Sequence, residues 1–144
     1  MVKLTKASKT SPVIVQQARR IVALVPNKDW AGEAEAIQNW VRNNIRYTRD
    51  PHGVETLQTP EVTLKELQGD CDDHSVLVGA LLSAVGHPVR YRAVSLKQYP
   101  SALCHVYAET KIGSAWVSVE TTENWPLGYI PEMVNLQGNV IRHV

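Results

Sequence analysis

Three residues in the second half of the chain have the types that thiol catalysis requires. Cys71 can act as a nucleophile, His105 can take and return a proton, and Glu120 can hold the imidazole in one tautomer. His105 falls in a predicted strand over Leu103–Thr110 and Glu120 in another over Ala115–Thr121, joined by a tight turn. Facing side chains on paired strands lie about 4.5–5.5 Å apart at Cβ. The pattern therefore predicts a triad of Cys71, His105 and Glu120.

The stretch around Cys71 predicts the helix that must present the thiol. Asp70 is a good N-cap, and Asp73 can reach back to the cap amide, so the helix should begin at Cys71. Residues 76–85 are almost entirely apolar, which predicts burial on most sides, and Gly86 offers a left-handed stop. Because the amides and the positive dipole end at a helix start favour an anion, Cys71 should readily form a thiolate.

The chain before Cys71 is predicted to be mainly helical. Ser11-Pro12 begins a helix over about residues 12–25, and Asp29 caps a second one with an apolar stripe that faces the core. The stripe consists of Ala36, Ile37, Trp40, Val41 and Ile45, whereas Glu33, Glu35, Asn39 and Arg42 should face water. Tyr47–Gln58, with Asp50-Pro51 and Gly53, predicts a loop, and a short helix over Val62–Leu67 follows Thr59-Pro60.

The chain after Cys71's helix changes to the two-residue period of strands. A strand is expected over Val89–Ser95, followed by the hairpin that carries His105 and Glu120. Residues 122–137 should be irregular, and Asn139–Val144 could add an edge strand. Helices followed by antiparallel strands indicate an α+β fold, in which N-terminal helices and a buried central helix pack on a small antiparallel sheet.

Composition limits the classes of protein that this chain can be. With 144 residues, 44% of them apolar, we expect one domain over residues 1–144, with residues 1–10 a frayed N-terminal segment. The net charge of +1, without a basic stripe, argues against nucleic acid or a membrane as the main partner. Two cysteines, no signal-like apolar segment and no membrane-spanning run predict a cytoplasmic protein.

Several ordered motifs resemble the transglutaminase-like superfamily of papain-related cysteine enzymes, in particular its small bacterial and phage members. The resemblance runs from about Ala34 to Thr122 and is carried by Gly69-Asp70-Cys71-Asp72-Asp73, by His105-Val106-Tyr107-Ala108-Glu109 and by Trp116-Val117-Ser118-Val119-Glu120-Thr121. It implies a papain-like core, with Cys71 and His105 at the family's motif positions. Glu120 stands where the family usually has aspartate.

The function expected from these residues is cysteine-dependent acyl transfer through a Cys71 thioester. The substrate would be a peptide, isopeptide or glutamine carboxamide in a peptide or protein, and the acyl acceptor is water or an amine. The Cys71 amide would supply one oxyanion donor, and Gln58, Trp40 or Tyr47 could supply the second. We expect no cofactor. The sequence does not indicate which oligomeric state the protein has.

Two alternatives follow from the same residues. Glu120 in place of aspartate favours a catalytically silent scaffold that binds a peptide or a partner protein. Metal binding would require zinc on Cys71, His74, Cys104 and His105, although adjacent residues of a strand point in opposite directions, or calcium on Asp70, Asp72 and Asp73.

Overall fold

The computed structural model describes residues 1–49 and 56–144, so Asp50-Pro51 and Gly53 of the predicted loop lie outside the described residues. The helices are α1 (Val2–Ser8), α2 (Pro12–Val22), α3 (Trp30–Asn44), α4 (Pro60–Glu66) and α5 (Cys71–Ala84). The strands are β1 (Arg46–Tyr47), β2 (Gln68–Gly69), β3 (Val89–Leu96), β4 (His105–Ile112), β5 (Ala115–Val119) and β6 (Val134–His143).

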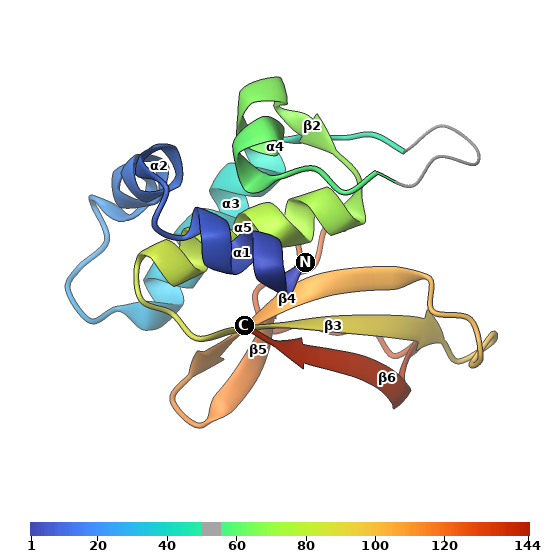
Figure 1. The fold of residues 1–144 in the computed structure, drawn as a ribbon. Helices are drawn as coiled ribbons and strands as arrows, with labels where there is room; N and C mark the ends of the chain where they lie inside the picture. Colours follow the sequence, from blue (N-terminus) through green and yellow to red (C-terminus); the bar gives the residue numbers. More distant parts are fainter. Residues whose placement is uncertain (50–55) are drawn as a thin grey trace.

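The helices lie on one face of a four-stranded antiparallel sheet with the order β5-β4-β3-β6 (Figure 1). Helix α5 packs across β4 and β3, with the other helices around it, and the main core lies between these layers. A smaller cluster on the opposite face of the sheet joins Val94, Tyr107 and Val134 to Trp125 and Ile130. The predicted α+β class, with a buried central helix on a small antiparallel sheet, is confirmed.

Helix α5 begins and ends as its sequence predicts. Asp70 Oδ1 accepts from Asp73 N at 3.0 Å, and Asp73 Oδ2 accepts from Asp70 N at 3.1 Å, which forms the reciprocal cap. All residues from Asp73 to Leu82 are buried. Gly79 is required where the helix meets β3, since a Cβ there would overlap with Tyr91 Oη. The chain leaves the helix at Gly86, whose φ of +92° suits glycine.

The N-terminal segment is not frayed as predicted, because residues 2–8 form α1. Thr5 is fully buried and hydrogen-bonds to Tyr91 Oη, and Ser8 Oγ donates to Glu61 Oε2 at 2.9 Å. Small hydroxyl side chains therefore dock this helix together with Val2, which packs against the main core. A polar sequence carries little signal for contacts of this kind.

Two further differences concern strands. Residues 46–47 lie in β1, which pairs in parallel with β2, so Tyr47 sits opposite Gly69 instead of opening a loop. Strand β6 begins at Val134, within the region predicted to be irregular, and pairs with β3. Gly138, at a φ of +70°, and a register shift between Ala93 and Ser95 interrupt β6, which explains why its two-residue period is not continuous.

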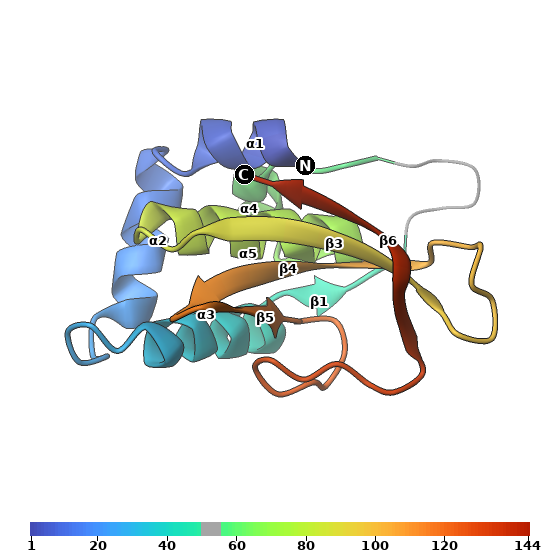
Figure 2. The same cartoon turned by 90° about the horizontal axis from the view of Figure 1, so that it is seen from below.

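Several connections gather at one end of the molecule. The segment joining β3 to β4, the short strand β1 and the start of β6 lie together at this end (Figure 2), where α5 also begins. Within the described residues, none of the helices combines the length and the apolar character needed to cross a membrane.

Candidate active site

The structure brings Cys71, His105 and Glu120 together at the start of α5. Cys71 is the first residue of the helix and is only partly buried. His105, the first residue of β4, is hydrogen-bonded to the Cys71 side chain, and its Nε2 hydrogen-bonds to Glu120 Oε2. Because Nε2 is taken by the carboxylate, Nδ1 is the ring nitrogen left for the thiol. The imidazole therefore lies between a sulfur and a carboxylate.

The electrostatics of this group favour a protonated imidazole. Burial alone would lower the pKa of His105, but its hydrogen bonds to Cys71 and Glu120 and the negative charges of both raise it to about 10. Burial alone would likewise raise the pKa of Glu120, but the hydrogen bond to His105 and the positive charge of that ring lower it. Near neutral pH, Glu120 is therefore an anion beside an imidazolium.

Glu120 reaches His105 along a diagonal between the two strands. The sequence instead predicts that the two residues face each other directly. The pairing of Ala108 with Val119 ends β5 one residue before Glu120 and, when extended, places Glu120 opposite Tyr107. Since Tyr107 and His105 are two residues apart, they lie on the same face of β4. A glutamate side chain, with its additional methylene, spans this diagonal, so the departure from aspartate does not break the contact.

The second oxygen of Glu120 is held by the turn that follows β5. Glu120 Oε1 accepts from Thr121 N at 2.8 Å, Thr122 N at 2.7 Å and Thr122 Oγ1 at 2.9 Å. Three donors on one oxygen fix the direction of the other oxygen, which points to His105. Glu120 is 2% exposed, so this arrangement is shielded from water.

Two side chains of α3 clamp the same turn from outside. Gln38 Nε2 donates to the carbonyl oxygens of Glu120 and Trp125, both at 3.0 Å. Arg42 Nη2 donates to the same two oxygens at 2.7 Å and to the Glu123 carbonyl at 3.3 Å. Arg42 thus binds the turn and does not face water as predicted. Its spacing of four residues from Gln38, beside the apolar stripe, is the signal that could have revealed a shared polar contact.

Helix α5 supplies two further anchors, Ser75 and His74, whose roles here the sequence does not predict. Ser75 Oγ donates to the Cys71 carbonyl at 2.7 Å and to the Val106 carbonyl at 3.1 Å, which ties the first turn of α5 to β4. His74 Nδ1 hydrogen-bonds to Thr121 Oγ1 at 3.1 Å, and burial lowers the pKa of His74, so its ring is neutral. The helix therefore positions both the thiol and the turn that carries Glu120.

Two cavities meet at the thiol and the imidazole, since Cys71, Cys104 and His105 line both. The larger cavity has a volume of about 410 Å³ and is completed by Tyr47, Arg49, Val94, Leu96, Glu123, Trp125, Pro131, Met133 and Val134. The smaller one has a volume of about 260 Å³ and is completed by Asp72, Ala93, Leu103 and Val106. Cys71 and His105 are thus accessible from both sides.

The structure separates the three candidates for a second oxyanion donor. Tyr47 lines the larger cavity together with Cys71. Gln58, whose Oε1 accepts from Thr63 Oγ1 at 3.0 Å, is not among the residues that line either cavity at Cys71, and Trp40 packs against the main core. Tyr47 is therefore the candidate that lies beside the thiol, held there by the pairing of β1 with β2.

Several of the residues considered for metal binding are hydrogen-bonded to other groups or lie apart from one another. His74 is buried against Thr121, and Cys104 is exposed just before β4 begins. Asp73 Oδ1 accepts from Gln58 N at 2.8 Å while its other oxygen completes the helix cap, so the acids serve the helix start. Over residues 1–49 and 56–144, no group of three or more His, Cys, Asp or Glu side chains is arranged to hold a metal ion.

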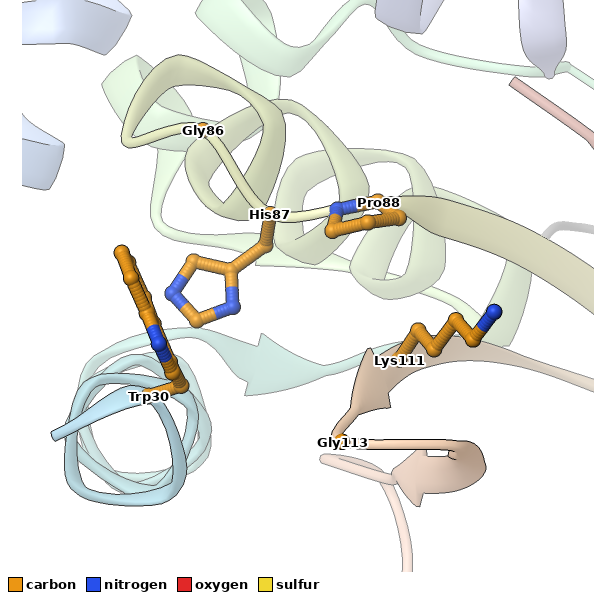
Figure 3. Close-up of a pocket in the computed structure, with 6 residues that line it drawn as sticks. All are labelled: Trp30, Gly86, His87, Pro88, Lys111 and Gly113. Atoms are coloured by element: carbon orange, nitrogen blue, oxygen red, sulfur yellow. The ribbon is translucent and has the colours of Figure 1, made fainter. Parts of the chain in front are cut away.

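A separate cavity of about 250 Å³ lies at the other end of α5 (Figure 3). The rings of Trp30 and His87 meet edge to face there with centroids 5.6 Å apart, and His87 Nε2 pairs with Glu33 Oε1 at 2.9 Å. Lys111 extends away from both rings in Figure 3. The described residues that line this cavity include no thiol or hydroxyl side chain.

The fold is shared with several solved structures. A Cytophaga hutchinsonii protein provisionally assigned as a cysteine protease superposes with a TM-score of 0.66 at 22% identity, over 94% of this chain and 47% of that one. A provisionally assigned protease from Parabacteroides distasonis superposes with a TM-score of 0.64 at 16% identity, over 83% of this chain and 25% of that one. Legionella pneumophila LapG superposes with a TM-score of 0.56 at 15% identity, over 84% of this chain and 72% of LapG. This chain therefore spans about half of the first protein and a quarter of the second.

Comparison of the sequence itself identifies the family. No curated protein matches the chain significantly. The family description of the transglutaminase-like superfamily matches residues 15–121, which is more than half of the chain and includes Cys71, His105 and Glu120. The solved structures above have the same fold. The chain belongs to the transglutaminase-like superfamily.

Proposed function

We propose that this protein is a cysteine-dependent acyl-transfer enzyme, a peptidase or amidase that cleaves a peptide, isopeptide or glutamine carboxamide bond through a Cys71 thioester. The observation that carries this proposal is the position of the His105 ring, hydrogen-bonded to Cys71 on one side and to Glu120 on the other, where two cavities meet. A thiol, a base and an orienting carboxylate in contact are the parts that nucleophilic catalysis requires.

The first half of the reaction forms the thioester. The Cys71 thiolate attacks the carbonyl carbon, and the oxyanion that develops is stabilised by the Cys71 amide at the start of α5 and by the Tyr47 hydroxyl. The intermediate then collapses, the C–N bond breaks, and the His105 imidazolium gives its proton to the departing amine. Glu120 keeps the ring oriented throughout and favours its protonated form.

The second half returns the enzyme to its starting state. His105, now neutral, takes a proton from the acceptor as the acceptor's oxygen or nitrogen attacks the thioester carbonyl. The C–S bond breaks, Cys71 leaves as a thiolate, and the acyl group departs as an acid or a new amide. We propose water as the acceptor, which the protease assignments of two structurally similar proteins support.

The alternative of a silent scaffold rests on glutamate in place of aspartate. The contact between Glu120 and His105 weakens that argument, because the longer side chain still reaches the ring. The proposed enzyme and the scaffold also differ in a simple observable, since a scaffold would form no covalent acyl intermediate.

The test is to trap the thioester. Purified protein is mixed with a library of peptide amides and glutamine-containing peptides, quenched in acid and analysed by intact mass and peptide mapping. We expect an acyl adduct on Cys71 that is absent in Cys71→Ala and decays in buffer, with oxygen from labelled water appearing in the product acid. An adduct that decays only when an amine is added would make the enzyme a transferase. No adduct on Cys71 with any substrate would contradict the proposal.

A further inference from the structure

We propose that the larger cavity beside Cys71 is a subsite for a large apolar side chain of the substrate, located within two residues of the carbonyl that Cys71 attacks. This inference rests on the proposed function and adds a substrate class to it. It would make the preferred substrate a peptide with a leucine-like or aromatic residue next to the reacting bond.

The walls of the larger cavity are mainly apolar, and three parts of the chain contribute most of their apolar side chains. Strand β3 contributes Val94 and Leu96, and the segment after β5 contributes Trp125. Val134, the first residue of β6, and Met133 just before it complete the apolar wall. Val94 and Val134 belong to the smaller hydrophobic cluster, against which Trp125 also packs. A ligand side chain in this cavity would therefore extend an existing core, and such contact is the usual basis of apolar recognition.

The location of the cavity ties it to the chemistry. The Trp125 ring meets the His105 ring edge to face, with centroids 5.8 Å apart, and Trp125 stands on the turn that Arg42 and Gln38 clamp. The wall of the cavity is thus fixed relative to the imidazole. A side chain bound against Trp125 would belong to a residue close to the attacked carbonyl.

Exposed apolar side chains around the site lack an explanation in the isolated chain. Met133 is 63% exposed, Leu103 51% and Tyr47 45%, and all three line one of the two cavities that meet at Cys71. A cluster of apolar side chains left in contact with water beside a nucleophile indicates a surface that a ligand covers. The volume of about 410 Å³ is within the range of about 300–1,000 Å³ that is common for ligand pockets.

The charges that line the larger cavity are balanced in sign. Apart from His105, the charged residues lining the larger cavity are Arg49 and Glu123, which are both exposed and of opposite sign. The smaller cavity is different, since Asp72 lines it without a lysine or arginine among the described lining residues. We therefore expect the two sides of Cys71 to select different groups, with the apolar group in the larger cavity.

The experiment measures how fast peptidyl acyloxymethyl ketones inactivate the full chain by alkylating Cys71. One series varies the residue next to the ketone and a second series varies the residue before it, with leucine, phenylalanine, alanine, aspartate or lysine. In one of the series, leucine or phenylalanine should react at least about tenfold faster than alanine, and aspartate should react more slowly still. The overturning result is that both series show no preference for an apolar side chain.

Two matched substitutions locate the preference. Met133→Asp places a charge on the cavity wall at an exposed position and should remove the preference for leucine and phenylalanine. Leu136→Asp makes the same kind of change at an exposed residue of β6 that does not line the cavity, and it should keep the preference. If Met133→Asp retained the full preference, the apolar group would bind elsewhere and the inference would be wrong.

Iodoacetamide separates a failure of this inference from a failure of the proposed function. The reagent carries no side chain, so it reports the reactivity of Cys71 alone and normalises the rate of each variant. If iodoacetamide reacts with Cys71 in a manner that depends on His105 while the peptidyl series shows no preference, only the subsite is wrong. If that dependence is missing, the enzyme proposal itself fails.

Discussion

Replacing Glu120 by glutamine should lower the pKa of His105 by about one to two units. The substitution keeps the shape of the side chain and an oxygen that can accept from Thr121 and Thr122, but it removes the negative charge next to the ring. A hydrogen bond to a charged group contributes about 1.5–3 kcal/mol, and one pKa unit corresponds to about 1.36 kcal/mol. Starting from a pKa of about 10, the His105 midpoint should fall to about 8–9.

The assay is an NMR titration of the histidine Cε1–H signals in carbon-labelled protein, with the His105 signal assigned by its loss in His105→Gln. Glu123→Gln is the matched control, because Glu123 lines the larger cavity but has no hydrogen bond from its side chain to the ring. We expect the midpoint of His105 in Glu123→Gln to stay near its value in the natural protein. An unchanged midpoint in Glu120→Gln would refute the reasoning, since it would mean that the carboxylate does not hold the imidazolium.

The same substitution should change stability in a direction set by the sign of the shift. The pKa of His105 is higher in the folded chain than its usual 6.5, so the stabilisation is fully present below about pH 6.5 and is lost as the pH rises through about 10. At the acid end of the pH range, the stabilisation by this ion pair is lost as the pH falls through the lowered pKa of Glu120. The difference in unfolding free energy between the natural protein and Glu120→Gln should therefore become smaller at both the acid and the alkaline end of the pH range.

Three further substitutions test other parts of the structure. Arg42→Met removes donors to three carbonyl oxygens and should lower the unfolding free energy by about 2–3 kcal/mol in urea titrations, and an unchanged midpoint would argue against the clamp. Tyr47→Phe should slow thioester formation by about 10²-fold without slowing iodoacetamide, which builds no oxyanion, and equal acylation rates would exclude the hydroxyl. Gly79→Ala should destabilise the protein by about 1–3 kcal/mol despite its better helix propensity, because the new Cβ meets Tyr91 Oη. Adding Tyr91→Phe should recover part of that loss, and no recovery would place the strain elsewhere.

The features that the sequence predicts best are those set by near neighbours in the chain. The cap at Asp70, the start at Cys71 and the stop at Gly86 depend on residues within a turn of one another, and the structure has all three. The hairpin of β4 and β5 is likewise local, which is why His105 and Glu120 could be placed near each other.

The features that the sequence misses depend on contacts between distant residues. Arg42 lies on the edge of its helix's apolar stripe, and only the position of the turn after β5 gives its guanidinium three carbonyl partners. The strand at Tyr47 has two residues and exists because Gln68–Gly69 lies beside it. Periodicity cannot report a strand of that length, and propensity cannot report a partner that is far away in the chain.

The most direct test of the central claim is the rate of iodoacetamide labelling at Cys71 compared with Cys104 in the same molecules. Both cysteines line the same two cavities, so Cys104 is an internal control for access, but the described hydrogen bond to His105 belongs to Cys71. We expect Cys71 to react much faster than Cys104 at pH 6–7, well below the usual thiol pKa of about 8.5, and His105→Ala to abolish the difference. Equal, slow labelling of both cysteines in the natural protein would contradict it.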